Sequence, residues 1–165
     1  MKNKVDVGDV FLIPLDAAGF GVGQVAGNWN GELYFLIYDA AYPTREVDPK
    51  LVISQTPLFA ALSLDAKIFH GDWPIIGNVT ENLGSIPQPA FKVNQEGRVF
   101  LESRDRSVSR PATCDEDAAL RFRNVVAPIR LENALKAHKG IGDWNPKYED
   151  LRFKYALESS RFVAN

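Results

Sequence analysis

The side chains in this sequence best suited to acid–base catalysis are a histidine and the carboxylates that could join it. His70 and Asp72 are separated by a single glycine, and the further candidate carboxylates are Asp9, Asp16 and Glu81. A histidine beside a carboxylate is a common general base. The same spacing is frequent in surface turns, however, so we expect an ordinary surface histidine and predict no catalytic residue and no enzyme activity.

A single cysteine and two distant histidines limit nucleophilic and metal chemistry. Cys114 precedes a predicted helix whose N-terminus favours a thiolate, but the acidic residues 115–117 oppose that effect. His70 and His138 are far apart in the chain and lack the clustered spacing of metal ligands. We therefore expect a structural cysteine, no bound metal and no cofactor.

Three glycines alternate with larger residues between Gly19 and Gly23, as in a phosphate-binding loop. The Lys-Ser/Thr pair of such a loop is missing, and no helical pattern follows. Alternate residues of a strand share one face, so the glycines instead predict a bent strand that a ring or another backbone approaches closely.

The elements that would position these side chains belong to a chain of 165 residues, of which 45% are hydrophobic and 24% charged. This length can bury a core without disulfides. The first residues lack the apolar segment of a signal peptide, and no apolar run is long enough to span a membrane. We expect a single domain, residues 1–165, located in a bacterial type of cytoplasm.

Strand patterns fill the first two thirds of the chain, and helical patterns follow. Predicted strands lie at 10–14, 20–25, 33–38, 51–53, 58–64, 75–76, 90–93 and 98–102, and predicted helices at 115–126, 130–139 and 146–162. Strands followed by helices predict an α+β fold. We expect a strongly bent, mostly antiparallel sheet or small barrel over residues 1–110, with about three helices of residues 111–165 packed on it.

Charge is divided unevenly along the chain, whose net charge is minus 2. Residues 1–88 contain five Lys/Arg and ten Asp/Glu, whereas residues 89–165 contain fourteen and eleven. Phosphates repel an acidic surface, so this balance disfavours a nucleic-acid binder. The densest basic cluster, Arg104, Arg106 and Arg110, is typical of a solvated loop.

Four short segments together resemble a known protein family. Residues 8–15 (GDVFLIPL) and 19–25 (GFGVGQV) resemble the opening of the immunity protein 26 family of bacterial polymorphic toxin systems, and residues 72–77 (DWPIIG) and 89–91 (PAF) resemble its second region. The resemblance covers about half of the chain. It implies a small cytoplasmic inhibitor, monomeric or weakly dimeric, that binds one cognate toxin and occludes its active site.

Residues on the turns of the acidic half are the expected contacts with such a toxin. Trp29 lies in an Asn-Gly turn, and exposed tryptophans are typical interface anchors. The carboxylates that would complement a basic toxin surface are Glu32, Asp39, Glu46, Asp48, Asp72 and Glu81. The alternative hypothesis is a barrel that binds RNA or a peptide through Phe20, Trp29, Tyr34 and the arginines of 98–110.

Overall fold

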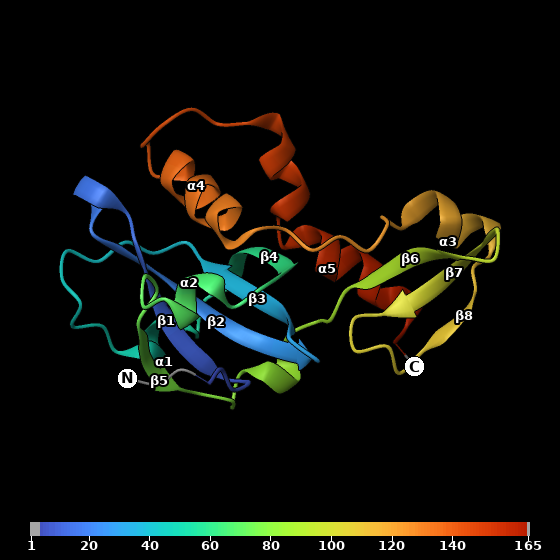
Figure 1. Cartoon of the computed structure of the whole chain (residues 1–165), viewed down its shortest axis with the longest axis horizontal. Helices are drawn as coiled ribbons and strands as arrows, with labels where there is room; N and C mark the ends of the chain where they lie inside the picture. Colours follow the sequence, from blue (N-terminus) through green and yellow to red (C-terminus); the bar gives the residue numbers. More distant parts are fainter. Residues whose placement is uncertain (1–3, 165) are drawn as a thin grey trace. The chain divides into compact units, whose positions relative to one another are not determined.

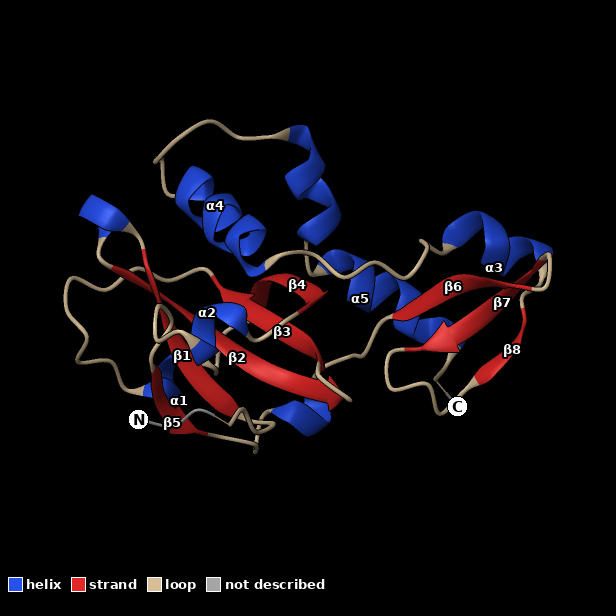
Figure 2. Cartoon of the chain, in the orientation of Figure 1, coloured by secondary structure: helices blue, strands red, loops and turns tan. Residues whose placement is uncertain are grey.

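Two β-sheets and a set of short helices make up residues 4–164, the part of the chain that this computed structural model describes (Figures 1 and 2). The chain contacts divide it into two compact units. Unit 1 contains the residues up to Ser85 together with Val125–Phe153, and unit 2 contains Ile86–Asn124 and the residues from Lys154 onwards. The α+β fold is confirmed, whereas the expectation of one domain stays a prediction.

Unit 1 is built on an open antiparallel sheet with the strand order β4-β3-β2-β1-β5. Its strands are β1 (Asp9–Pro14), β2 (Phe20–Trp29), β3 (Glu32–Tyr38), β4 (Pro57–Ser63) and β5 (Ile75–Asn78). The sheet is mostly antiparallel as predicted, but it does not close into a barrel because β4 and β5 remain its two edges. Asn30 and Gly31 both have positive φ and make the two-residue turn that their Asn-Gly sequence predicts.

The helices of unit 1 are short except for one, α4 (Pro128–His138), which lies over the sheet in Figure 1. Pro128 occupies its first turn, where the missing N–H costs nothing, and Gly140 follows its C-terminus with a φ of 88°. The others are α1 (Pro49–Val52), α2 (Ala66–Phe69) and the 3-10 helices η1 (Asp16–Ala18), η2 (Leu83–Ser85) and η3 (Pro146–Leu151).

The core of unit 1 lies between α4 and one face of the sheet. Leu131, Ala134 and Leu135 of α4 pack there against strand residues such as Phe11 and Phe35. Gly21 and Gly23 leave the necessary room: a Cβ on Gly21 would lie 2.5 Å from Leu135 Cδ2, and one on Gly23 would lie 2.5 Å from the Phe11 ring. The close approach that the alternating glycines predict is therefore present.

Trp73 joins the same core to α4 by a polar contact. Its ring is fully buried and stacks on Phe11 with centroids 5.1 Å apart. Its Nε1–H donates to the carboxylate of Glu132 over 3.1 Å, and Lys136 Nζ donates to the other oxygen of that carboxylate over 3.4 Å. The buried Glu132 is thereby paired on both oxygens.

Three predicted elements have the wrong form, two of them for a shared reason. Residues 51–53 are not a strand, because Asp48 caps α1 by accepting from Lys50 N and Pro49 opens it. The helix predicted at 115–126 ends at Ala119, and the one at 146–162 is interrupted at residues 152–153. In both places the backbone pairs with a strand instead: Val126 N donates to Leu62 O, and Phe153 N donates to Leu58 O.

Unit 2 is a three-stranded antiparallel sheet with helices against it. Its elements are β6 (Ala90–Gln95), β7 (Arg98–Ser103), β8 (Ser109–Pro111), α3 (Cys114–Ala119), α5 (Lys154–Ser159) and the 3-10 helix η4 (Ser160–Phe162). Ala90, Leu101 and Leu120 form its small core. Because so little apolar surface is buried there, the polar contacts of this unit matter for its order.

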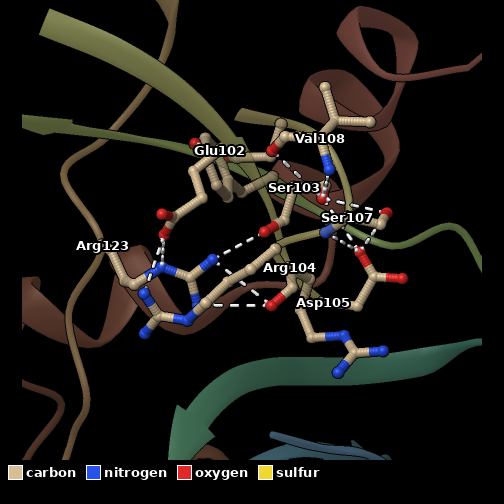
Figure 3. Close-up of polar contacts among 10 residues, drawn as sticks. Glu102, Ser103, Arg104, Asp105, Ser107, Val108 and Arg123 are labelled. Carbon is tan, nitrogen blue, oxygen red and sulfur yellow. Dashed lines mark hydrogen bonds and ion pairs between the residues drawn. The ribbon is translucent and has the colours of Figure 1, made fainter. Parts of the chain in front are cut away.

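A buried guanidinium fixes the β7–β8 turn (Figure 3). Arg123 pairs with Glu102 over 2.5 Å, with both side chains under 10% exposed, and donates to Ser103 O over 2.6 Å. Within the turn, Asp105 accepts from the backbone and hydroxyl of Ser107 and from the Ser103 hydroxyl. These hydrogen bonds lower the pKa of the Asp105 carboxyl to about 2.

The predicted capping box at the start of α3 is also present. Thr113 Oγ1 accepts from Glu116 N, and the Glu116 carboxylate accepts from Thr113 N. Arg110 adds two parallel hydrogen bonds of 2.8 and 2.7 Å to the same carboxylate. The guanidinium lowers the pKa of the Glu116 carboxyl to about 2.

We expect Gly21→Val to destabilise the protein by about 1–3 kcal/mol, because the added side chain would collide with Leu135. Chemical denaturation measures the loss. Gly84→Val is the matched control, since a Cβ at Gly84 meets no atom within 4 Å and its φ is not positive. Equal stability of the two variants would show that Gly21 is not required for the packing of α4 on the sheet.

We expect stability to fall with acid because Glu116 and Asp105 both have pKa values of about 2, below their ordinary 4.5 and 3.8. Their contacts stabilise the fold above pH 4.5 and are lost as the pH falls through 2. Glu116→Gln should therefore cost about 2 kcal/mol at pH 6 and little at pH 2. Denaturant unfolding across this range tests it, with the exposed Glu158→Gln as control. A cost independent of pH would contradict it.

Candidate binding surface

The residues considered for catalysis show no catalytic arrangement in unit 1. Asp9 is fully buried, where its carboxylate accepts from Asp6 N and from Asn78 Nδ2. His70 follows α2, and its ring packs edge-on against Phe69 with centroids 5.3 Å apart. Asp72 pairs instead with Lys67, 3.7 Å away. Within residues 4–164, no group of three or more His, Cys, Asp or Glu side chains is placed to hold a metal ion, and no helix is long and apolar enough to cross a membrane.

Trp29 and Glu32 face each other across the β2–β3 hairpin, as directly paired residues. Directly paired residues of antiparallel strands share one face. Leu33 pairs with Ser63, the last residue of β4, so Leu64 directly follows β4 at the same end of the sheet. Trp29 and Leu64 are 39% and 50% exposed, and Glu32 is half-buried. An aromatic ring, a carboxylate and a leucine thus lie at one end of the sheet.

Leu64 is the residue at this end of the sheet that sequence reasoning missed. The predicted strand 58–64 included it, but β4 ends at Ser63, and only the register of β3 and β4 shows that Leu64 lies at the same end of the sheet as Glu32. Leucine side chains are usually buried, so the residue type gave no sign that this side chain is exposed.

Asp39 lies just after β3, at the opposite end of the sheet from these residues. Lys139 Nζ donates to Asp39 Oδ1 over 2.5 Å, and His138 Nε2 lies 3.2 Å from Oδ2. The lysine, with a smaller contribution from the histidine, lowers the pKa of the Asp39 carboxyl. Asp39 thus stays ionised, and its side chain remains 47% exposed.

Glu46 and Asp48 lie in the connection between β3 and α1. Both residues are exposed. Asp48 has a structural role because its carboxylate accepts from Lys50 N as the N-cap of α1. For Glu46, the backbone N–H donates to Thr44 Oγ1, and its carboxylate is not part of the α1 cap. Of the two, Glu46 is the better candidate for contact with a partner.

Glu81 lies on a loop that a buried polar network fixes to the sheet. The neighbouring Asn82 donates to Gln24 Oε1, which also accepts from the hydroxyl of Tyr38. Gln24 Nε2 donates in turn to Val79 O over 2.7 Å. Burial raises the pKa of the Tyr38 hydroxyl, so it stays a donor. Glu81 is therefore an exposed residue on a loop that these buried hydrogen bonds hold in place.

The seven predicted contact residues all belong to unit 1 but do not form one cluster. Glu32 begins β3 and Asp39 follows it, so about 23 Å of strand separates them. Trp29 and Glu32 are brought together, and Asp39, Glu46 and Asp48 lie along one connection. Asp72 and Glu81 lie on other loops.

The barrel alternative loses one of its stacking residues. Tyr34 is only 1% exposed, so its ring cannot stack on a base or peptide. Arg104 and Arg106 are also held within unit 2, by Gln88 and Glu102. The sheet is open rather than closed into a barrel, so the barrel of that alternative is wrong, and Tyr34 is not available for stacking.

Formal charge separates the two units, although less sharply than it separates the two halves of the sequence. Unit 1 contains fourteen Asp/Glu and ten Lys/Arg, a net charge of minus 4, whereas unit 2 contains seven and nine, a net charge of plus 2. In unit 2, arginines and a lysine also hold Glu102, Glu116 and Asp117 in ion pairs. Unit 1 is consequently the unit suited to a cationic partner.

Comparison with known proteins gives one family. The sequence model of the family described as Immunity protein 26 matches residues 6–98, more than half of the chain. No curated protein and no solved structure gives a significant match. The matched stretch contains all five strands of the unit 1 sheet and the four segments whose sequences resemble this family. The chain therefore belongs to the Immunity protein 26 family.

Proposed function

We propose that this protein is a cytoplasmic immunity protein that binds a cognate bacterial toxin and neutralises it by covering the active site. The observation that carries the proposal is the match of residues 6–98 to a family of immunity proteins. The net charge of minus 4 on unit 1 supports it, because a negative surface attracts a basic partner and raises the rate of encounter. In this proposal the chain acts by binding and performs no catalysis.

The contact surface that we propose is the acidic surface of unit 1. Its members are Trp29, Glu32, Asp39, Glu46, Asp48, Asp72 and Glu81, to which the structure adds Leu64. A standard interface of about 800 Å² per partner is roughly 30 Å across, so one toxin can reach both ends of β3. A toxin that acts on nucleic acid would fit this surface, since its cleft must attract phosphates and would equally attract these carboxylates.

We expect this chain to protect cells against the toxin domain encoded by the adjacent reading frame. Expression of that domain alone should stop growth, and co-expression with this chain should restore it. A toxin domain from an unrelated system is the control, because protection by specific binding should not extend to it. Growth arrest that is unchanged by co-expression would overturn the proposed function.

We expect charge and apolar anchors to act on different rate constants. Glu46→Lys combined with Asp48→Asn, which keeps the α1 cap, should slow association several-fold and weaken its salt dependence. Trp29→Ala should leave association unchanged and speed dissociation at least tenfold. Binding kinetics with a catalytically inactive toxin domain measure both rates at several salt concentrations.

The matched control makes the same change of charge in unit 2, through Glu158→Lys combined with Asp115→Asn, both exposed residues. It should leave association nearly unchanged. Association that is insensitive to salt, or contacts that map to residues after 113, would show that the acidic surface of unit 1 is not the contact surface.

A further inference from the structure

An apolar row crosses one face of the three-stranded sheet of unit 2. Val93 pairs with Phe100, and Phe100 pairs with Pro111, so the three side chains share that face. Val93 and Phe100 are half-buried, and Pro111 is exposed. Leu101, the next residue after Phe100, belongs to the opposite face, where the small core of unit 2 lies. The apolar row is therefore on the face directed away from that core.

Arg98 adds a positive charge to this row. It lies two residues before Phe100 on the same strand, and its guanidinium is 5.9 Å from the centre of the Phe100 ring. Arg98 is exposed, and within residues 4–164 no carboxylate forms an ion pair with it, including that of Glu96 in the preceding turn. We call Val93, Phe100, Pro111 and Arg98 the outer face of unit 2.

The outer face is poorly suited to a nucleic acid strand. Such a strand carries one phosphate per nucleotide and is bound by several cations. The arginines near Arg98 are already paired: Arg106 and Arg123 with Glu102, and Arg110 with Glu116. One available cation beside an apolar row instead fits an apolar protein surface that carries a carboxylate.

Unit 1 presents a surface of that composition around α2. Leu64 and Phe69 are 50% and 51% exposed, and Asp65 is exposed between them in the chain. Phe69 N donates to Asp65 O over 2.8 Å, which keeps these residues within one turn. The Asp65 side chain makes no capping hydrogen bond, and in the described part of the chain it forms no ion pair, because Lys67 of α2 pairs with Asp72. We call Leu64, Asp65 and Phe69 the α2 patch.

We propose that the outer face of unit 2 binds the α2 patch of a second copy of this chain. The leucine and phenylalanine of the patch cover the apolar row, and Asp65 of one copy pairs with Arg98 of the other. Both surfaces are accessible in the single chain, and their charges are opposite. Small interfaces are weak, so this self-association depends on protein concentration and, through the ion pair, on salt.

Exchanging the two charges tests this proposal. Sedimentation equilibrium at low salt, over about a hundredfold range of protein concentration, measures the association constant. Arg98→Glu and Asp65→Lys should each lower that constant about tenfold, because like charges then meet. Both substitutions in one chain restore opposite charges and should recover most of the wild-type value. The matched controls are Arg161→Glu, at another exposed arginine beside an aromatic ring, and Glu158→Lys, at an exposed carboxylate, and both should associate like the wild type. Melting temperatures establish that every variant folds.

Each outcome decides the proposal without bearing on the proposed function, which does not require self-association. Recovery in the double variant supports the pairing of Arg98 with Asp65. A wild-type chain that stays monomeric throughout, or single variants that associate like the wild type, would overturn it. Loss in the single variants without recovery in the double variant would also contradict the pairing. A monomeric wild type whose binding to the inactive toxin domain is weakened by Arg98→Glu would assign the outer face to the toxin instead of a second copy.

Discussion

The packing of α4 against the five-stranded sheet is the contact on which the rest of unit 1 depends. It needs an absent Cβ at Gly21, where Leu135 enters, and a hydrogen bond from the fully buried Trp73 to Glu132. Phe11 takes part by stacking on Trp73 and by occupying the space above Gly23. Three of the four segments that resemble the family, residues 8–15, 19–25 and 72–77, therefore meet in the core of unit 1. They form the surface on which α4 packs, and α4 itself lies outside the matched residues 6–98.

The same contact sets the charges at the surface. A buried carboxylate is tolerated only when donors satisfy it, and Glu132 has the indole of Trp73 and the ammonium of Lys136. Lys136 also pairs with Asp16 over 3.4 Å, and one turn later Lys139 pairs with Asp39. A shift of α4 would consequently move the lysine partners of two exposed carboxylates, Asp16 and Asp39. Packing in the core and electrostatics at the proposed contact are coupled through one helix.

Local signals in the sequence predicted the local structure. The Asn-Gly turn, the capping box of Thr113 and Glu116, and the alternating glycines each depend on residues close in the chain, and each is present. The failures lie where a distant partner decides the conformation. Val126 and Phe153 have side chains compatible with a helix or a strand, and they are extended because β4 offers backbone partners far away in the sequence. No periodicity in those segments could reveal that pairing.

The proposed contact surface was less predictable than the fold because it lies largely on turns and connections, where no periodic pattern separates exposed from buried residues. Trp29 was identified from its turn, whereas Leu64, Ala17 and Ala41 resemble core residues by residue type, and their exposure follows from their places in the chain connections. This difference has a functional consequence. Substitutions at Gly21, Phe11 or Trp73 disturb the packing of α4 on the sheet. Substitutions at the exposed residues Ala17, Ala41 or Leu64 leave the core unaltered. The framework can therefore stay fixed while its exposed connections are fitted to a particular partner.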